Sequence, residues 1–412
     1  MKSFFSHSFL PHSSRVIFFQ GNGQENFGHN DDIEQKESPE ENAQENNDQL
    51  QWLENIGQSK KNWDEVLQKL THTTTAESTS VDIQGDGFSE EKINQSTKER
   101  ERHFEKKRQE QKAELLNDFS QNPIIQEIFR QDQQKRVFHL SDDPDLQTDF
   151  TAELQDLFLQ YKEGTITEKD LSSRGSEKYL DFLRKRASRI SGKEFSQFVE
   201  KYGGTGVMVQ ELGLKPGEIY GMSSSQFNTL SDVEKKEIAL APLLEPINLS
   251  SLPKDRVIDG IQVHQFIEQN NVRNYLDLIR AVEDHYGYPE MLQQILWTES
   301  RGDAMAVSPT YCVGMFQASS YFYGTKGRFN GDYINPFNRV EAIIRAGKFV
   351  EDLAGGGRNQ RSILTRYNND PQVGNYAGKV QGEYKTFIRL LDQGNERFIA
   401  QNSRAEKRNI SS

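Results

Sequence analysis

The hydrophobic pattern divides the chain into a polar first part, a helical middle part and a strongly patterned C-terminal part. Residues 1–86 are mostly polar, and the stretch from Gly21 to about Gln49 is dominated by Glu, Asp, Asn and Gln. Such a stretch buries too little apolar area to offset the entropy that is lost on ordering. We therefore expect residues 1–86 to be largely disordered, with one short amphipathic helix near 51–70.

Residues 87–120 contain closely mixed charges of both signs, which predict one long solvated helix. A basic patch for an anionic polymer is the alternative interpretation, and the interleaved glutamates disfavour it. Residues 121–250 follow as a helical region, because apolar side chains recur there at helical spacing. The clearest stripe comprises Phe150, Leu154, Leu157, Phe158 and Tyr161. Val207, Val209 and Leu212 predict a short strand, and the role of the region as scaffold or binding module stays open.

Helical spacing is sharpest in residues 257–392, where one amphipathic helix is followed by a second one that starts near Pro289. On this second helix, Glu299 falls on the same face as Ile295 and Leu296. Burial makes a carboxyl costly to ionise, so it raises the pKa and keeps the group protonated near neutrality. The alternative is a Glu that ends the helix and points to water. Together with a polar tail at 393–412, the pattern predicts a mainly α fold.

The composition of the chain argues against several classes of function. The chain has 412 residues, 34% hydrophobic content and a mean hydropathy of −0.81, too polar for a uniformly globular protein. Its net charge of −12 disfavours nucleic-acid binding. Cys312 is the single cysteine, and the dispersed histidines lack ligand spacing. The run Gly355 to Gly357 lacks the ending of a phosphate-binding loop. We expect no metal, no cofactor and no transmembrane segment.

A motif follows the second helix. Glu299-Ser300 precedes an Ala-x-Ser element, Ala306 to Ser308, and then Gly314-Met315-Phe316-Gln317. In order and spacing these elements resemble the soluble lytic transglycosylase domain of the lysozyme-like superfamily, whose pattern is Glu-Ser, Ala-x-Ser and Gly-Leu-Met-Gln. Two later blocks, Asn335-Pro336 and Tyr367-Asn368, resemble further parts of the same domain. The resemblance covers roughly Leu276 to Leu391.

The resemblance implies a lysozyme-like α-helical domain at 257–392 that cleaves the β-1,4 bond between MurNAc and GlcNAc in peptidoglycan. Glu299 would act first as a general acid. It would then act as the base that deprotonates the muramic acid 6-hydroxyl, which closes a 1,6-anhydro ring. The resemblance also implies Ser300 and Gln317 as positioning residues, Met315 and Phe316 as an apolar wall, and Tyr367 and Asn368 as the cleft lining. Loop and helix-end hydrogen bonds are the alternative roles of Ser300 and Gln317.

Two other functions stay open. A goose-type-lysozyme-like hydrolase needs a second carboxylate, for which Asp303 and Asp332 are the candidates near the motif. A catalytically silent wall-binding or scaffold protein would bind a protein partner through its N-terminal or central helical region. The chain also departs from the family at Tyr311-Cys312, where the family commonly has Gly-Ala, and at Asn369-Asp370, where it has Ala-Gly.

The substrate implies a location. Peptidoglycan lies outside the cytoplasm, so we expect the protein to act in the cell envelope or as a secreted protein. The N-terminal residues show neither a continuous apolar core nor the small-residue cleavage site of a secretion signal. The export route therefore stays open.

Overall fold

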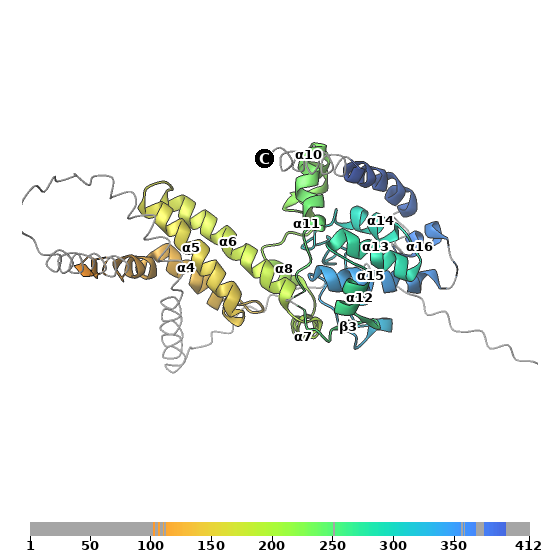
Figure 1. Ribbon diagram of the computed structural model, residues 1–412, viewed down its shortest axis with the longest axis horizontal. Coiled ribbons are helices and arrows are strands. Elements are labelled where there is room, and N and C mark those ends of the chain that lie inside the picture. The colour runs from red at the N-terminus through yellow and green to blue at the C-terminus, as the bar shows by residue number, and fades with distance from the viewer. Residues whose placement is uncertain are drawn as a thin grey trace, which may run out of the picture. The chain divides into compact units, whose positions relative to one another are not determined.

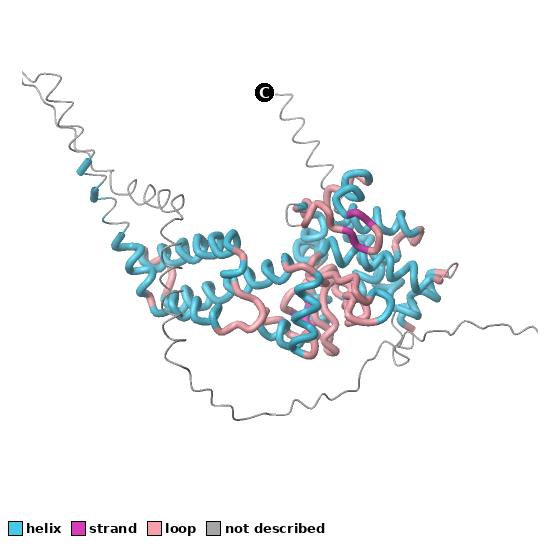
Figure 2. The backbone as a smooth tube through the Cα atoms, turned by 90° about the horizontal axis from the view of Figure 1, so that it is seen from below, coloured by secondary structure: helices cyan, strands magenta, loops and turns pink. Residues whose placement is uncertain are grey.

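The computed structural model confirms the predicted mainly α fold. It describes residues 113–249, 252–355, 359–367 and 375–392, together with 102–103, 106–107, 110 and 357. Strands occur in this part of the chain as two short antiparallel pairs, drawn in magenta in Figure 2. No described helix has the length and apolar character needed to cross a membrane. The predicted N-terminal disorder, the helix near 51–70 and the tail at 393–412 lie outside the described residues.

The described residues form two compact units. One contains the described residues up to Ala187 together with Glu211–Gly213. The other contains Ser188–Gln210 and the described residues from Leu214 onward. The sequence pattern placed a boundary between 250 and 257, whereas the unit that carries Glu299 already begins at Ser188.

The N-terminal unit is a group of helices that lie side by side in Figure 1. They are a helix at 113–121, α4 (Pro123–Gln133), α5 (Pro144–Lys162) and α6 (Glu168–Arg189), with the short η1 (Leu140–Asp142) before α5. The last two residues of α6 belong to the other unit. A side-chain oxygen caps the N-terminus of α4 and of α5, and a proline follows each cap. Phe150 of α5 packs against Tyr179 and Phe182 of α6.

The C-terminal unit contains most of the remaining elements. In chain order they are α7 (Gly192–Tyr202), α8 (Gly206–Glu211), β1 (Glu218–Ile219), β2 (Met222–Ser223), α9 (Ser224–Thr229), α10 (Asp232–Lys235), η2 (Lys236–Leu240), α11 (Ala241–Leu244), β3 (Val257–Ile258), β4 (Ile261–Gln262), α12 (Val263–Gln269), α13 (Tyr275–Tyr286), α14 (Met291–Glu299), η4 (Gly327–Phe329), α15 (Arg339–Ala354), α16 (Gln360–Tyr367) and a helix at 376–392. The last residue of α8, Glu211, belongs to the N-terminal unit.

The strand predicted at Val207 and Val209 is wrong, because these residues lie in α8. The buried residues Met208, Val209 and Leu212 share one side of a helix, whereas the neighbours Met208 and Val209 would point to opposite faces of a strand. The burial pattern is therefore helical.

Helix α14 lies at the centre of the C-terminal unit. It packs against α13 and α15, which also pack against each other (Figure 1). Residues 291–298 of α14 are all buried, so the protein surrounds the helix on every side, including its polar residues Gln293, Gln294 and Thr298. Its N-terminus is capped from another helix, because Glu283 of α13 accepts hydrogen bonds from the backbone N–H and the side-chain amide of Gln293, at 2.9 and 2.7 Å.

The two strand pairs belong to a repeated module of a hairpin followed by a helix. Each module has the order Ile-x-Gly, four residues, then Gln-Phe: Ile219-Tyr220-Gly221 to Gln226-Phe227, and Ile258-Asp259-Gly260 to Gln265-Phe266. Both hairpins turn through two residues with positive φ, 50° and 74° in the first and 50° and 83° in the second. Glycine at the second turn position suits this tight turn. In both modules the side chain of the last hairpin residue, Ser223 or Gln262, caps the N-terminus of the helix.

Candidate active site

Glu299 is the last residue of α14 and the point at which this buried helix reaches the surface. The eight preceding residues of the helix are buried, whereas Glu299 is partly exposed. The helix ends here because Ser300 and Arg301 leave the helical backbone, with φ values of −140° and 60°. Burial of α14 between α13 and α15 therefore fixes the place of one carboxyl group.

Two tyrosines lie beside this carboxyl. The hydroxyl of Tyr376, in the helix at 376–392, donates a hydrogen bond to Oε1 of Glu299. The Tyr376 ring stacks on that of Tyr367, with centroids 6.5 Å apart and planes 9° apart. The hydroxyl of Tyr367 donates to the backbone carbonyl of Phe316 at 2.7 Å, and both tyrosines are buried. The two rings thus hold the loop after Glu299 against the C-terminal helix.

The surroundings of Glu299 push its pKa in both directions. Burial is the largest effect and raises the pKa above its ordinary value. The hydrogen bond from Tyr376 and the positive charges of Lys379 and Arg301 lower the pKa, and the negative charge of Glu383 raises it. The net effect is an increase, so Glu299 keeps its proton at a higher pH than an ordinary glutamic acid does.

An ion pair joins the residue after Ser300 to the helix at 376–392. Arg301 Nη1 lies 2.7 Å from Oε2 of Glu383 and also donates to the carbonyl of Trp297. The guanidinium group lies over the Trp297 ring, 5.5 Å from its centroid. Arg301 thereby links the end of α14 to the same C-terminal helix that supplies Tyr376.

Ser300 and Gln317 hold the loop that follows Glu299. The Ser300 hydroxyl donates to the carbonyl of Met315 at 2.7 Å and accepts from the N–H of Gly302 at 3.1 Å. The Gln317 amide donates to the carbonyl of Gly314 at 2.8 Å. Both contacts are hydrogen bonds within the loop, as the alternative interpretation of these two residues expects.

Gly314 is required by close backbone packing. Its φ is 80°, and a Cβ at this position would lie 2.3 Å from the carbonyl oxygen of Pro336. The Gly-x-x-Gln element and the Asn-Pro element, 21 residues apart in the sequence, therefore meet at this glycine.

Met315 and Phe316 were expected to form an apolar wall of the cleft. Both are buried, with exposed fractions of 0% and 1%, so their side chains pack beneath the surface. Their backbone carbonyls accept the hydrogen bonds from Ser300 and Tyr367. Asn368, the remaining residue expected at the site, lies outside the described residues.

Asp303 and Asp332, the candidates for a second carboxylate, both bind a hairpin turn. Asp303 accepts from the N–H of Tyr220 at 2.6 Å and, through its other oxygen, from the N–H of Met305 at 2.8 Å. Asp332 accepts from the N–H of Asp259 at 3.2 Å and lies 3.2 Å from Arg345 Nη2. Tyr220 and Asp259 occupy the same position of the two hairpin modules. Both aspartates thus have structural partners.

Sequence reasoning did not assign Tyr376, Lys379 and Glu383 to the site. A signal for them exists, since positions 376, 379 and 383 share one face of a helix and carry polar groups next to the buried Ala377 and Val380. Nothing in the sequence says that this face meets Glu299, because the contact joins residues 77 positions apart.

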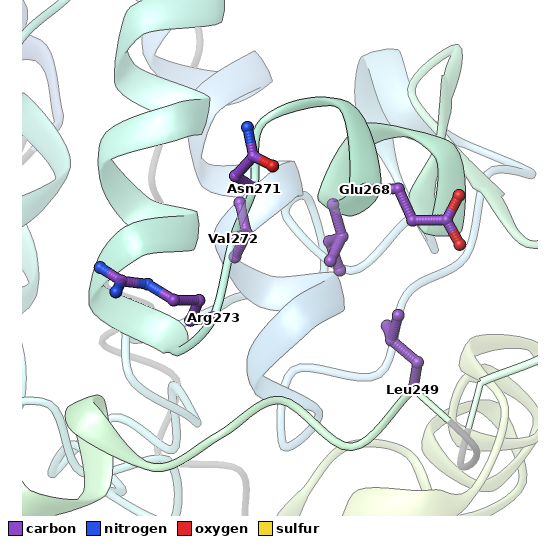
Figure 3. A pocket seen from close by; sticks show the side chains of 6 residues that line it. Leu249, Glu268, Asn271, Val272 and Arg273 are labelled. Atoms are coloured by element: carbon purple, nitrogen blue, oxygen red, sulfur yellow. The ribbon is translucent and has the colours of Figure 1, made fainter.

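A separate pocket lies between Leu249 and the C-terminal end of α12 with the segment that follows it (Figure 3). Its lining comprises Leu249, Ile267, Glu268, Asn271, Val272 and Arg273. Figure 3 shows Glu268 on α12 and Asn271 and Val272 on the segment that leads to α13. Glu268 is exposed to water and Arg273 pairs with Asp277 at 3.3 Å. This pocket therefore contains no buried acid comparable to Glu299. No group of three or more His, Cys, Asp or Glu suited to a metal ion occurs among the described residues.

Comparison of the chain with protein-family models, with characterised proteins and with solved structures gave no match. The assignment of a function to the Glu299 site therefore depends on its geometry and on the motif resemblance.

Proposed function

We propose that the protein is a peptidoglycan lytic transglycosylase that cleaves the β-1,4 bond between MurNAc and GlcNAc. The observation that carries the proposal is Glu299, a partly exposed carboxyl with a raised pKa at the end of a buried helix. A group of this kind can hold a proton near neutrality and deliver it to a glycosidic oxygen. Because peptidoglycan lies outside the cytoplasm, the protein would act there.

In the first step the protonated Glu299 donates its proton to the oxygen that links the two sugars. The bond between this oxygen and C1 of MurNAc breaks as positive charge develops on the ring. The leaving GlcNAc keeps the bonding electrons and takes up the proton, and Glu299 becomes a carboxylate. The hydrogen bond from Tyr376 and the charges of Lys379 and Arg301 would stabilise this carboxylate.

In the second step the Glu299 carboxylate removes the proton from the 6-hydroxyl of the same MurNAc. The 6-oxygen then bonds to C1 and closes the 1,6-anhydro ring. Glu299 regains its proton, so atoms and charges balance without water as a reactant. One carboxyl serves both steps, which agrees with the structural roles of Asp303 and Asp332 at the hairpin turns.

A goose-type-lysozyme-like hydrolase is the competing function. It would require a carboxylate that activates water or attacks C1. The negative charge of Glu383 acts on Glu299, and this carboxylate is paired with Arg301. This arrangement favours the transglycosylase.

The substitution Glu299→Gln tests the proposal. It keeps the shape of the side chain and removes the proton donor, so we expect solubilisation of purified peptidoglycan to fall by about 1,000-fold or more. Glu268→Gln makes the same chemical change at an exposed glutamate outside the site and should leave the rate unchanged. Undiminished activity of Glu299→Gln, with a normal circular dichroism spectrum, would remove Glu299 from the mechanism.

A further inference from the structure

The loop between the Ala-x-Ser and Gly-x-x-Gln elements forms a tight, well-bonded turn. The backbone N–H of Tyr311 donates to the carbonyl of Ser308 at 2.9 Å, and the N–H of Ser308 donates to the carbonyl of Cys312 at 2.8 Å. The Ser308 hydroxyl also accepts from the N–H of Cys312 at 3.0 Å. Val307 and Val313 pair on either side of the turn. The conformation of residue 311 is thus fixed by its neighbours.

Tyr311 has left-handed backbone in this turn, with a φ of 61°. This conformation costs a bulky residue about 1 kcal/mol, and glycine or asparagine adopts it more easily. The Tyr311 carbonyl accepts a hydrogen bond from the Thr205 hydroxyl at 2.8 Å, which helps to hold the strained residue. A tyrosine at a strained position suggests that the side chain has a use there.

The Tyr311 side chain is exposed. Four large hydrophobic residues in the described part of the chain are exposed, and Tyr311, at 46%, is the aromatic one among them. The other three are Val233, Leu244 and Val257. Its ring therefore adds little to the core, and its loss should cost little stability.

The turn is connected to the Glu299 site through the loop that follows it. Val313, the residue after Cys312, pairs with Ala318, and the carbonyl of Phe316 between them accepts the hydrogen bond from Tyr367. The Tyr367 ring stacks on Tyr376, whose hydroxyl donates to Glu299. Burial raises the pKa of the Cys312 thiol, and the negative charge of Glu299 raises it further. The same thiol acts electrostatically on Tyr367, whose ring stacks on Tyr376. The exposed ring is thus adjacent in sequence to a residue within electrostatic reach of the candidate acid.

We infer that Tyr311 is a stacking platform for one sugar ring of the glycan strand, next to the sugars whose bond is cleaved. This inference rests on the proposed function of the Glu299 site. A pyranose ring has an apolar face of C–H groups, which an exposed aromatic ring complements, and a rim of hydroxyls, which polar side chains complement. The same turn carries the exposed Thr310, whose hydroxyl is hydrogen-bonded to that of Ser308 at 3.0 Å and can also bind the rim of the sugar. A protein partner would more commonly need a larger apolar patch.

The test measures glycan binding by the full-length protein in the Glu299→Gln background, which keeps the ligand uncleaved. The ligand is a soluble, peptide-free MurNAc–GlcNAc oligomer, titrated by calorimetry. Tyr311→Asn removes the ring and tolerates the left-handed backbone, whereas Tyr311→Phe keeps the ring. We expect Tyr311→Asn to weaken binding by about five- to tenfold and Tyr311→Phe by less than twofold.

Thermal unfolding of the same variants separates binding from folding. Tyr311→Asn should unfold at the same or a higher temperature than its parent, since it relieves backbone strain. Equal affinity of Tyr311→Asn and its parent would overturn the stacking role and leave the proposed function intact. An absence of oligomer binding in the parent itself would contradict both. A third outcome is binding that depends on Tyr311 together with undiminished cleavage by the single variant Glu299→Gln. This outcome would overturn only the catalytic assignment of Glu299.

Discussion

Glu299 combines two requirements that conflict in water, a proton that is held near neutrality and a carboxylate that is stable once the proton has left. Burial at the end of α14 supplies the first by raising the pKa. The Tyr376 hydroxyl and the charges of Lys379 and Arg301 act in the opposite direction and supply the second. A single carboxyl can then serve as acid and as base in turn.

At the residue scale, Tyr376→Phe tests this balance. The hydrogen bond from Tyr376 lowers the pKa of Glu299, so its removal raises that pKa further. Activity that needs the protonated acid is lost as pH rises through the pKa of Glu299, and this loss should therefore move to higher pH in the variant. We also expect kcat/KM to fall by about tenfold, because a hydrogen bond to a charged group is lost.

The pH profile of kcat/KM on peptidoglycan measures both effects. Tyr384→Phe, which changes the tyrosine directly after Glu383 in the same helix, is the matched control and should keep the original profile. An unshifted alkaline limb in Tyr376→Phe would show that this hydrogen bond does not set the pKa of the catalytic group.

At the element scale, α14 depends on a cap that comes from α13. Glu283 is buried, accepts two hydrogen bonds from Gln293, and has a pKa raised to about 7 by burial. A folded-state pKa above the unfolded value near 4.5 means that this group stabilises the fold most at low pH. The stabilisation is lost as pH rises through about 7.

Glu283→Gln should remove this pH dependence, since the amide stays neutral. Between pH 4.5 and 7 the free energy of unfolding of the parent should fall relative to that of the variant, by roughly 3 kcal/mol at most. Urea unfolding at a series of pH values measures this difference, with the exposed Glu268→Gln as control. Parallel stability curves for parent and Glu283→Gln would contradict the role given to Glu283.

The repeated hairpin modules are a second feature at this scale. Each directs the N–H of a turn residue at an aspartate of the site region, Tyr220 at Asp303 and Asp259 at Asp332. The second contact is reinforced by the buried Arg345, which donates to Asp259 at 2.6 Å. The two modules thus fix the segments on either side of the Gly-x-x-Gln element. Asp303, before this element, and Asp332, after it, therefore have a structural role in binding the hairpin turns.

The elements that the sequence predicted well are those set by local patterns. Apolar spacing predicted the helix that ends at Glu299, and the fold is mainly α as expected. The contact of Tyr376 with Glu299 and the binding of Asp303 by Tyr220 join residues far apart in the chain, and no local pattern encodes such contacts. The strand expected at Val207 failed for a different reason, because three apolar positions fit two periodicities.

At the scale of the whole molecule, the domain that carries the site is larger than the motif. The Asn335 amide donates to the carbonyl of Ile190 at 3.0 Å, and the ring of Phe227 packs edge-on against Trp297 of α14. Residues between 188 and 249 therefore contribute to the core around α14, although the resemblance begins only near Leu276.

Two fragments test how far the domain around α14 extends toward the N-terminus. A fragment of residues 188–412 should unfold cooperatively and keep the peptidoglycan-cleaving activity of the full chain within about twofold. A fragment of residues 257–412 lacks both contacts and the hairpin that binds Asp303, so we expect it to unfold without a cooperative transition. Thermal unfolding measures the cooperativity of each fragment, and the cleavage assay measures its activity. Full activity of the shorter fragment would show that residues 188–256 are dispensable.

The central claim is that one carboxyl closes an anhydro ring without the use of water. Mass spectrometry of glycan fragments, released from purified peptidoglycan in water enriched in heavy oxygen, tests this claim most directly. We predict MurNAc ends that carry the 1,6-anhydro ring and no heavy oxygen, and no products from Glu299→Gln. Reducing MurNAc ends that contain heavy oxygen would contradict the account and identify a hydrolase.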